Sequence, residues 1–192
     1  MKKIVFIVII ILNVFTNSIA QEIKRIIVGN IDAKISIIAF ESMTCSHCAS
    51  FHKNVFPQLK KEYLDTGLAK IEFRHFPLDI AAFNASKVAQ CKNDGNSDIL
   101  QSLYSNQQKW VKGNSIEEAN KNLQKFLINQ GFDIDFENCI SDQKIEDFVL
   151  NDRIDGVKNF KVNATPTIII NDEKFEKTLN YKNLKKALEK LI

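Results

Sequence analysis

Glycine and proline are scarce in this sequence, with 6 glycines and 3 prolines among 192 residues. No stretch has the composition of a long flexible linker, and we find neither an internal repeat nor a low-complexity tract. The hydrophobic share of 45% and the charged share of 26% are ordinary values for globular proteins. The length is sufficient for one domain with a core of its own. We therefore expect a single globular domain.

A large excess of one charge is also missing. The formal net charge is +3, and Lys2 and Lys3 account for two of these charges. Without the first twenty residues, 24 basic residues face 23 acidic ones. This balance gives no electrostatic reason to expect nucleic acid or an anionic membrane as a partner.

The apolar run near the N-terminus, residues 4–14, is shorter than the roughly 20 residues that a membrane-spanning helix needs. It follows the basic Met1-Lys2-Lys3, and Ser18 and Ala20 place small residues at positions −3 and −1 of a cleavage site. We predict that residues 1–20 are a secretory signal peptide and that Gln21 becomes the new N-terminus. The alternative is an uncleaved anchor. No cysteine follows the predicted cleavage site, so we expect no lipid anchor there.

Cysteine is limited to 4 residues, an even number that suits two pairs in an exported chain. Two of them form the motif Cys45-Ser46-His47-Cys48. An apolar run that is typical of a buried strand precedes the motif, and apolar residues at helical spacing follow it. The motif therefore lies where a strand ends and a helix begins. Unpaired backbone N–H groups and the helix dipole stabilise a thiolate at such a position.

This context favours a redox-active cysteine pair. We expect Cys45, at the tip of the helix, to be the nucleophile and Cys48, one turn further, to be the resolving thiol. Two other interpretations remain open. Cys45, Cys48 and His52 could be a partial set of zinc ligands, or the two cysteines could be inert structural residues. Our preferred interpretation requires no metal.

Glu41 lies at the end of the predicted strand, four residues before Cys45. It is either a solvated carboxylate at the strand end or a partly buried proton acceptor for the resolving thiol. In the second case Glu41 would tune the redox pair.

The order of predicted elements is that of an α/β protein. The first strands and the helix at 45–65, which Gly67 ends, form a βαβ unit, whose strands should be parallel with a right-handed crossover. Helical patterns then fill residues 80–158, before strand character returns. One predicted helix runs from Ile99 to Trp110, and the next begins near Ser115 with a Ser or Asn cap. The predicted strands lie at 23–28, 35–40, 69–77, 167–170 and 174–175, and a last helix lies at 181–191.

Cys91 and Cys139 both fall in the helical stretch. A disulfide between them would close a loop of roughly fifty residues and stabilise the fold by about 4 kcal/mol in the chain-entropy model. We expect this structural disulfide in an exported chain. The alternative is two buried free thiols, which pack as small apolar groups.

The strand–Cys45-Ser46-His47-Cys48–helix unit, the helical insertion, and Ala164-Thr165-Pro166-Thr167 before an apolar strand coincide in this chain. Together with Phe73-Arg74-His75-Phe76-Pro77-Leu78, they resemble the DsbA family of thioredoxin-like thiol–disulfide oxidoreductases over essentially all of residues 21–192. The paired Cys91 and Cys139 resemble the alphaproteobacterial members. The resemblance implies a thioredoxin fold with an inserted helical domain at about 79–145.

The resemblance also implies residue roles. Cys45 forms the mixed disulfide, Cys48 resolves it, and the dipeptide Ser46-His47 tunes the redox potential. The histidine, His47, stabilises the Cys45 thiolate, although serine stands here where proline is commonest. Pro166 is expected to be cis, which would place Thr165 beside the sulfurs to hold the substrate chain.

The function that follows is that of a periplasmic dithiol oxidase that introduces disulfide bonds into exported proteins with free thiols. The family implies a membrane quinone-linked partner that reoxidises it. No organic cofactor is implied, and we expect a monomer. The alternatives are a disulfide isomerase or reductase, a non-redox chaperone, and a zinc-binding module. Threonine at position 165 is typical of the isomerase branch, but the few residues between Gln21 and the first strand leave no room for that branch's dimerisation domain.

Overall fold

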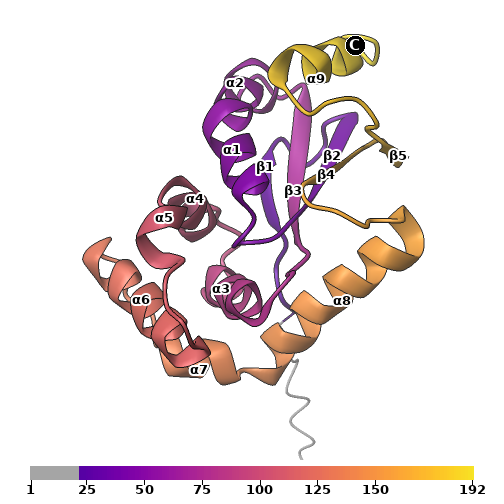
Figure 1. The fold of residues 1–192 in the computed structure, drawn as a ribbon. Coiled ribbons are helices and arrows are strands. Elements are labelled where there is room, and N and C mark those ends of the chain that lie inside the picture. The colour runs from indigo at the N-terminus through magenta and orange to yellow at the C-terminus, as the bar shows by residue number, and fades with distance from the viewer. Residues whose placement is uncertain (1–21) are drawn as a thin grey trace, which may run out of the picture.

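The computed structural model describes residues 22–192, so the predicted signal peptide at 1–20 lies outside the described residues. A mixed five-stranded sheet forms the centre of the molecule, in the order β1-β3-β2-β4-β5 (Figure 1). Strand β2 pairs with β3 in parallel, as the βαβ pattern predicted, and the other neighbouring pairs are antiparallel. The strands are β1 (Ile26–Gly29), β2 (Ile35–Glu41), β3 (Ala69–His75), β4 (Thr167–Ile170) and β5 (Glu173–Lys174).

Strand β2 is central because both of its faces are buried. Ile37 and Ala39 point into the larger core, whereas Ile38 and Phe40 point into a smaller cluster on the opposite face. This alternation follows from the two-residue period of a strand. A nearly continuous apolar run is the sequence signature of such a strand, which is why residues 35–40 could be recognised.

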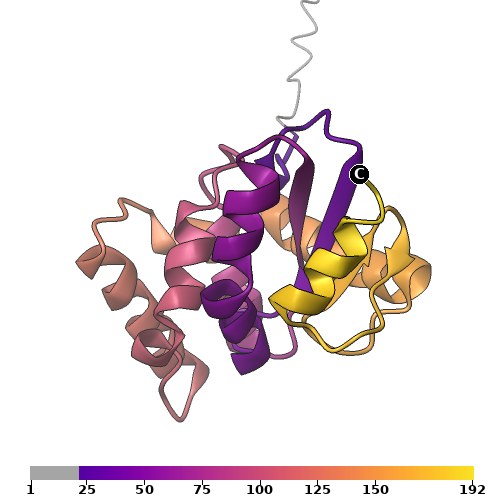
Figure 2. The ribbon, with the colours of Figure 1, turned by 90° about the horizontal axis from the view of Figure 1, so that it is seen from above.

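Helices cover both faces of the sheet, as the view from above shows (Figure 2). Helices α1 (Ser46–Asn54), α2 (Phe56–Leu59) and α9 (Tyr181–Leu188) lie on one face. Helix α8 (Gln143–Phe160) lies on the other, against β3. The helix packs tightly against the sheet at Gly156, where an added Cβ would lie 2.9 Å from the Phe40 ring.

The remaining helices form a separate layer beside the sheet, between β3 and β4 in the chain. They are α3 (Ile80–Gln90), α4 (Asp98–Ser105), α5 (Gln107–Trp110), α6 (Ile116–Asn129) and α7 (Phe136–Ser141). The thioredoxin fold with an inserted helical domain is thereby confirmed. The insertion end that we expected near residue 145 falls inside α8, a continuous helix that starts beside α7 and runs back to the sheet.

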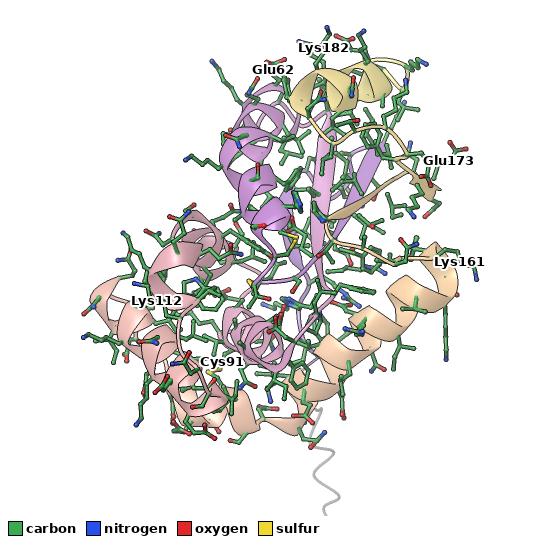
Figure 3. All side chains as sticks on the ribbon, in the orientation of Figure 1. Glu62, Cys91, Lys112, Lys161, Glu173 and Lys182 are labelled. Carbon is green, nitrogen blue, oxygen red and sulfur yellow. A yellow bond between two sulfur atoms is a disulfide. The ribbon has the colours of Figure 1, made fainter. Side chains whose placement is uncertain are left out.

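A disulfide joins Cys91, the C-cap of α3, to Cys139 in α7, with Cα atoms 5.4 Å apart. Cys91 lies within the inserted helical domain, away from β2 (Figure 3). The bond therefore links two helices of that layer to each other.

Two predicted helices are divided in the structure. The single helix expected at 45–65 consists of α1, α2 and a π-helical turn at Lys60–Leu64. Pro57, at the start of α2, has no N–H to donate to the preceding turn, so the chain restarts there. The helix expected between Ile99 and Trp110 is likewise interrupted at Asn106, which caps α4 and starts α5. Both single-helix predictions were wrong in this respect.

Candidate functional site

The two free cysteines of residues 22–192 lie where β2 gives way to α1. Cys45 is the N-cap residue of α1 and is half-buried, whereas Cys48 is fully buried one turn further. The backbone N–H of Cys45 donates to the carbonyl of Ser42 at 3.0 Å, which fixes the loop that leads into the helix. The strand–loop–helix position predicted for the pair is confirmed.

The surroundings of Cys45 favour its thiolate. The neighbouring Cys48 thiol, by hydrogen bonding, is the largest cause that lowers the pKa of Cys45, to about 5. Burial acts in the opposite direction, while Thr165 and the backbone N–H groups of His47 and Cys48 lower the pKa further. These N–H groups belong to the first turn of α1, where no carbonyl of the helix can accept from them.

Cys48 has the opposite character. Burial raises the pKa of the Cys48 thiol, and the nearby charges of Glu41 and Cys45 raise it as well. One thiol of the pair is therefore ionised at neutral pH and accessible, while the other is protonated and enclosed. This asymmetry suits a nucleophile and a resolving thiol.

The loop before β4 closes over the Cys45 sulfur. The Thr165–Pro166 peptide bond is cis, as the family resemblance implied. The Cys45 thiol donates to the carbonyl oxygen of Thr165, with 3.3 Å between Sγ and O. The Thr165 hydroxyl is buried and has no partner among the described residues, so it can donate to the sulfur once the thiolate forms. A cavity of about 490 Å³ adjoins this loop and is lined by Thr165, Pro166, His47 and Tyr181 among others.

Glu41 is buried rather than solvated. Its side chain is 3% exposed, and its Oε2 atom lies 2.8 Å from Nε2 of His52. Burial is the largest cause that raises the pKa of Glu41, and His52 partly offsets it. The Oε1 atom has no partner among the described residues. The interpretation of Glu41 as a solvated strand-end carboxylate is therefore wrong, because the side chain lies inside the protein against His52 of α1.

His52 connects Glu41 to the inserted helical domain. Its Nδ1 atom lies 2.9 Å from Oε1 of Gln101 in α4, and its ring stacks on Tyr104 with 4.1 Å between centroids. The two ring nitrogens thus contact Gln101 on one side and Glu41 on the other, and these two contacts fix the orientation of the imidazole.

The sequence analysis did not assign their structural roles to three residues that support the site, and it considered His52 only as a possible zinc ligand. His52 and Gln101 are described above, and the Gln107 side chain in α5 donates to the carbonyls of Met43 and Cys45 at 2.8 and 3.0 Å. A signal for His52 was available, because residues four apart lie on the same face of a helix and His52 follows Cys48 by four. Gln101 and Gln107 gave no such signal, since only the tertiary fold brings them near the motif.

Ser46 and His47 are exposed at the tip of α1, on the surface beside Cys45. Both ring nitrogens of His52 already have protein partners. Within residues 22–192, no three His, Cys, Asp or Glu side chains lie close enough together to hold a metal ion. In the same residues, no helix combines the length and apolar character needed to span a bilayer.

A central sheet of this order, a strand–Cys-x-x-Cys–helix unit and a facing cis X-Pro loop define the thioredoxin-fold class. A family model described as thioredoxin matches residues 21–190, and the chain belongs to that family, among its DsbA-type members. The crystal structure of Wolbachia pipientis alpha-DsbA1 superposes with a TM-score of 0.77 at 29% identity, and the match covers 87% of this chain and 90% of that one.

Curated relatives agree with this assignment. A putative protein-disulfide oxidoreductase of Rickettsia bellii is 29% identical over 168 residues, which are 86% of this chain and 64% of the relative. Disulfide bond formation protein D of Bacillus subtilis is 24% identical, with 85% of this chain and 75% of the relative covered. The chain spans about half to two thirds of the length of the rickettsial relatives.

Proposed function

We propose that this protein is a thiol–disulfide oxidoreductase, and specifically a dithiol oxidase that transfers the Cys45–Cys48 disulfide to other proteins. The observation that carries the proposal is the lowered pKa of Cys45, about 5, beside a buried partner thiol. A site that stabilises the thiolate stabilises the reduced pair, and this makes the disulfide form a stronger oxidant. The names of the rickettsial and Bacillus relatives support the same chemistry.

In the first step, a substrate thiolate attacks Sγ of Cys45 in the oxidised pair. A substrate–Cys45 disulfide forms, and the bond to Cys48 breaks with its electron pair on the Cys48 sulfur. Because burial raises the pKa of Cys48, this thiolate takes up a proton. In the second step, another substrate thiolate attacks the substrate sulfur of the mixed disulfide, and Cys45 leaves as a stable thiolate. The substrate then carries the disulfide, and the enzyme holds two more electrons.

The Glu41–His52 pair is the proposed source of the proton for Cys48. Glu41 affects the pKa of Cys48 through its charge, and burial raises the pKa of Glu41, so that its carboxyl group holds a proton more readily than an exposed one. The same groups accept the proton when the reaction runs in reverse. Thr165 and Pro166 are the proposed contacts for the backbone of the bound substrate, since their loop lies over the Cys45 sulfur.

The proposed setting is the periplasm, with export directed by the signal peptide at 1–20. The substrates are then exported proteins with free thiols, a membrane quinone-linked partner reoxidises the pair, and the protein acts as a monomer. In this proposal, the disulfide between Cys91 and Cys139 stabilises the fold.

The decisive measurement is the reduction potential of the Cys45–Cys48 pair, by equilibration in glutathione buffers followed by thiol trapping. An oxidase is expected to have a value well above about −180 mV, which is typical of disulfide isomerases. A value near about −270 mV, that of thioredoxin, would contradict the oxidase role and indicate a reductase. A Cys45→Ser variant should lose exchange activity altogether, whereas a chaperone would keep its activity without either cysteine.

A further inference from the structure

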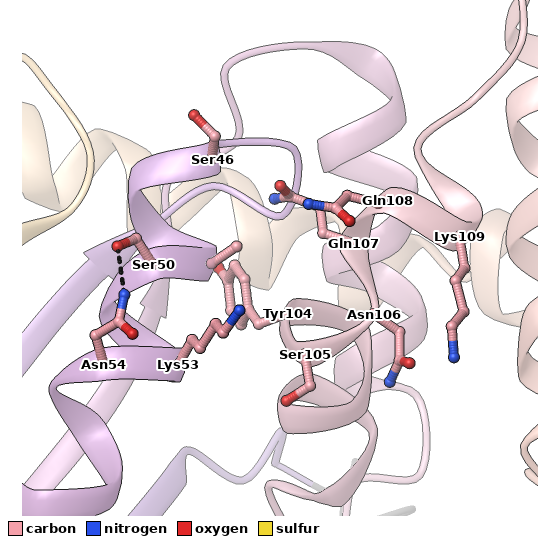
Figure 4. A pocket seen from close by; sticks show the side chains of 11 residues that line it. Ser46, Ser50, Lys53, Asn54, Tyr104, Ser105, Asn106, Gln107, Gln108 and Lys109 are labelled. Carbon is pink, nitrogen blue, oxygen red and sulfur yellow. Dashed lines mark hydrogen bonds between the residues drawn. The ribbon is translucent and has the colours of Figure 1, made fainter.

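Cys45 has a second depression beside it, distinct from the cavity at Thr165 and Pro166. It has a volume of about 420 Å³ and lies between α1 on one side and α4 and α5 on the other (Figure 4). Ser46, next to Cys45 in the chain, forms its upper end, while His47 faces the cavity of the cis-proline loop. A polypeptide whose thiol reaches Cys45 therefore has two paths along the protein.

Most residues that line this second depression have polar or positively charged side chains. Lys53 of α1 and Lys109 of α5 line it, together with amide and hydroxyl side chains, and no carboxylate does. Lys109 also lines an adjoining depression of about 290 Å³, where Lys112 and Lys125 are found and carboxylates are again absent. We call the two depressions together the lysine groove.

The four lysines of the groove are exposed, and none of them forms an ion pair within residues 22–192. The lysines that do form ion pairs there are Lys60, Lys87, Lys174 and Lys185. Basic and acidic residues are almost balanced in the chain after residue 20. The groove is thus a local cluster of positive charge on a nearly neutral protein, and the cluster does not simply reflect an excess of basic residues over the whole chain.

The groove is also held in a fixed position relative to the reactive sulfur. Gln107 in its wall donates to the carbonyls of Met43 and Cys45, and this links α5 to the loop of the motif. Tyr104 of the lining is buried and stacks on His52. A segment bound in the groove would therefore have a defined distance from Cys45.

We propose that the lysine groove binds an acidic segment of the substrate polypeptide, close in sequence to the cysteine that reacts with Cys45. This inference rests on the proposed function and adds a preference among substrates. Ser46 and Lys53 are seven residues apart on α1, which is about 10 Å along the helix axis. About three residues of extended chain cover that distance. The structure thus assigns the preferred carboxylates to positions two to four residues from the reacting cysteine.

The test uses the full protein with Cys48→Ala and two peptides of matched sequence. One peptide carries two glutamates at positions three and four from its cysteine, and the other carries two glutamines. Each peptide cysteine is activated as a disulfide with thionitrobenzoate. The Cys45 thiolate attacks the peptide sulfur, forms the Cys45–peptide disulfide and releases the coloured thionitrobenzoate anion. The rate of release measures how well each peptide reaches Cys45.

At low ionic strength, we expect the acidic peptide to react about fivefold faster, which is the scale of two exposed charge pairs. The preference should disappear at about 1 M salt, where charges are screened over a few ångström. Lys53→Gln with Lys109→Gln should abolish it, and the matched control Lys144→Gln with Lys158→Gln, on α8 and outside the groove, should retain it. The ratio of the two peptide rates cancels any change in the reactivity of Cys45 itself.

Equal rates for the two peptides, or a preference that survives in the Lys53→Gln/Lys109→Gln protein, would overturn the inference. The exchange reaction needs only the Cys45 thiolate, so its result does not depend on whether the protein acts as an oxidase or as a reductase. Oxidation of dithiol versions of both peptides by the intact, oxidised protein then tests the proposed function separately. If neither dithiol peptide is oxidised, the oxidase role fails while the charge preference stays measurable.

Discussion

The Nε2 atom of His52 lies 2.8 Å from Oε2 of Glu41, and both side chains are enclosed between the sheet, α1 and α4. Through Oε1 of Gln101, the inserted helical domain orients the imidazole that faces the carboxyl group. The protonation of the redox site is therefore linked to a domain that lies outside the βαβ unit carrying the cysteines.

Glu41→Gln should slow the release of a mixed disulfide at Cys45, because Cys48 then lacks a nearby group that takes its proton. A positioned acid or base commonly contributes a hundredfold or more, and we expect a loss of at least about tenfold at neutral pH. Stopped-flow release of glutathione from the Cys45–glutathione protein measures this step. The pH profile should also lose the inflection caused by Glu41. The matched control is Glu62→Gln, at an exposed ion pair with Lys185, and a profile identical to that of the unaltered protein would contradict the assignment.

The thiol of Cys45 should titrate with a midpoint of about 5 in the reduced protein. Ultraviolet absorbance of the thiolate, or the pH dependence of alkylation, measures it. In Cys48→Ala the midpoint should move up toward the usual 9.0, because the Cys48 hydrogen bond is the largest cause of the shift. A titration midpoint near 9 for Cys45 in the unaltered protein would contradict the proposed oxidase role.

The same ionisation makes the stability of the reduced protein depend on pH. The folded-state pKa of Cys45 lies below the usual value, so the stabilisation is complete above about pH 9 and is lost as the pH falls through about 5. The oxidised protein has no Cys45 thiol to titrate and is the control. Between pH 5 and pH 8, the urea concentration at the unfolding midpoint should therefore increase more for the reduced protein than for the oxidised protein. A difference between the two midpoints that stays constant with pH would contradict this prediction.

Removing the disulfide between Cys91 and Cys139 should destabilise the fold. The two residues are 48 positions apart, and the chain-entropy model gives a loss of about 4 kcal/mol for a loop of that size. The Cys91→Ala/Cys139→Ala protein should unfold at lower urea concentration, with Cys45 and Cys48 kept reduced in both proteins. An unchanged midpoint would mean that the bond contributes nothing to the folded state.

Gly156→Ala should destabilise the contact between α8 and the sheet. The new Cβ would lie 2.9 and 3.0 Å from two atoms of the fully buried Phe40 ring and 3.2 Å from Phe76. Overpacking of this kind costs about 1–3 kcal/mol, and the better helix propensity of alanine offsets at most about 1 kcal/mol. The neighbouring, exposed Val157→Ala is the control for thermal unfolding. A rise in melting temperature for Gly156→Ala would show that α8 can shift away from the sheet.

The sequence predicted the order of elements and the position of the Cys45–Cys48 pair between a strand and a helix well, because both depend on local patterns. The burial of β2 was visible as a continuous apolar run. A Ser or Asn cap was expected where α6 begins, and Ser115 is that cap, with its side chain accepting from the N–H of Glu118. The breaks at Pro57 and Asn106 escaped the prediction because apolar spacing continues across them. Periodicity reports which face of a segment is buried, and not whether every hydrogen bond along it is formed.

The environment of Glu41 could not be predicted in the same way. Its burial depends on side chains from α1 and α4, and Gln101 comes from a domain more than fifty residues further along the chain. Charged residues at strand ends are usually solvated, so the sequence favoured the wrong interpretation. Only the packing of three elements against each other makes this carboxyl group part of the site.

The distance in sequence between Cys45 and Thr165 has a consequence for biosynthesis. These residues are 120 positions apart, and β4, which follows Thr165, covers the second edge of β2. At usual rates of translation, about 6 to 24 s pass between the two. During that time the nascent chain has both cysteines but lacks the loop that closes over Cys45, and β2 has an open apolar edge that invites pairing with other strands. The ribosome therefore releases the reactive motif well before the rest of the chain can enclose it.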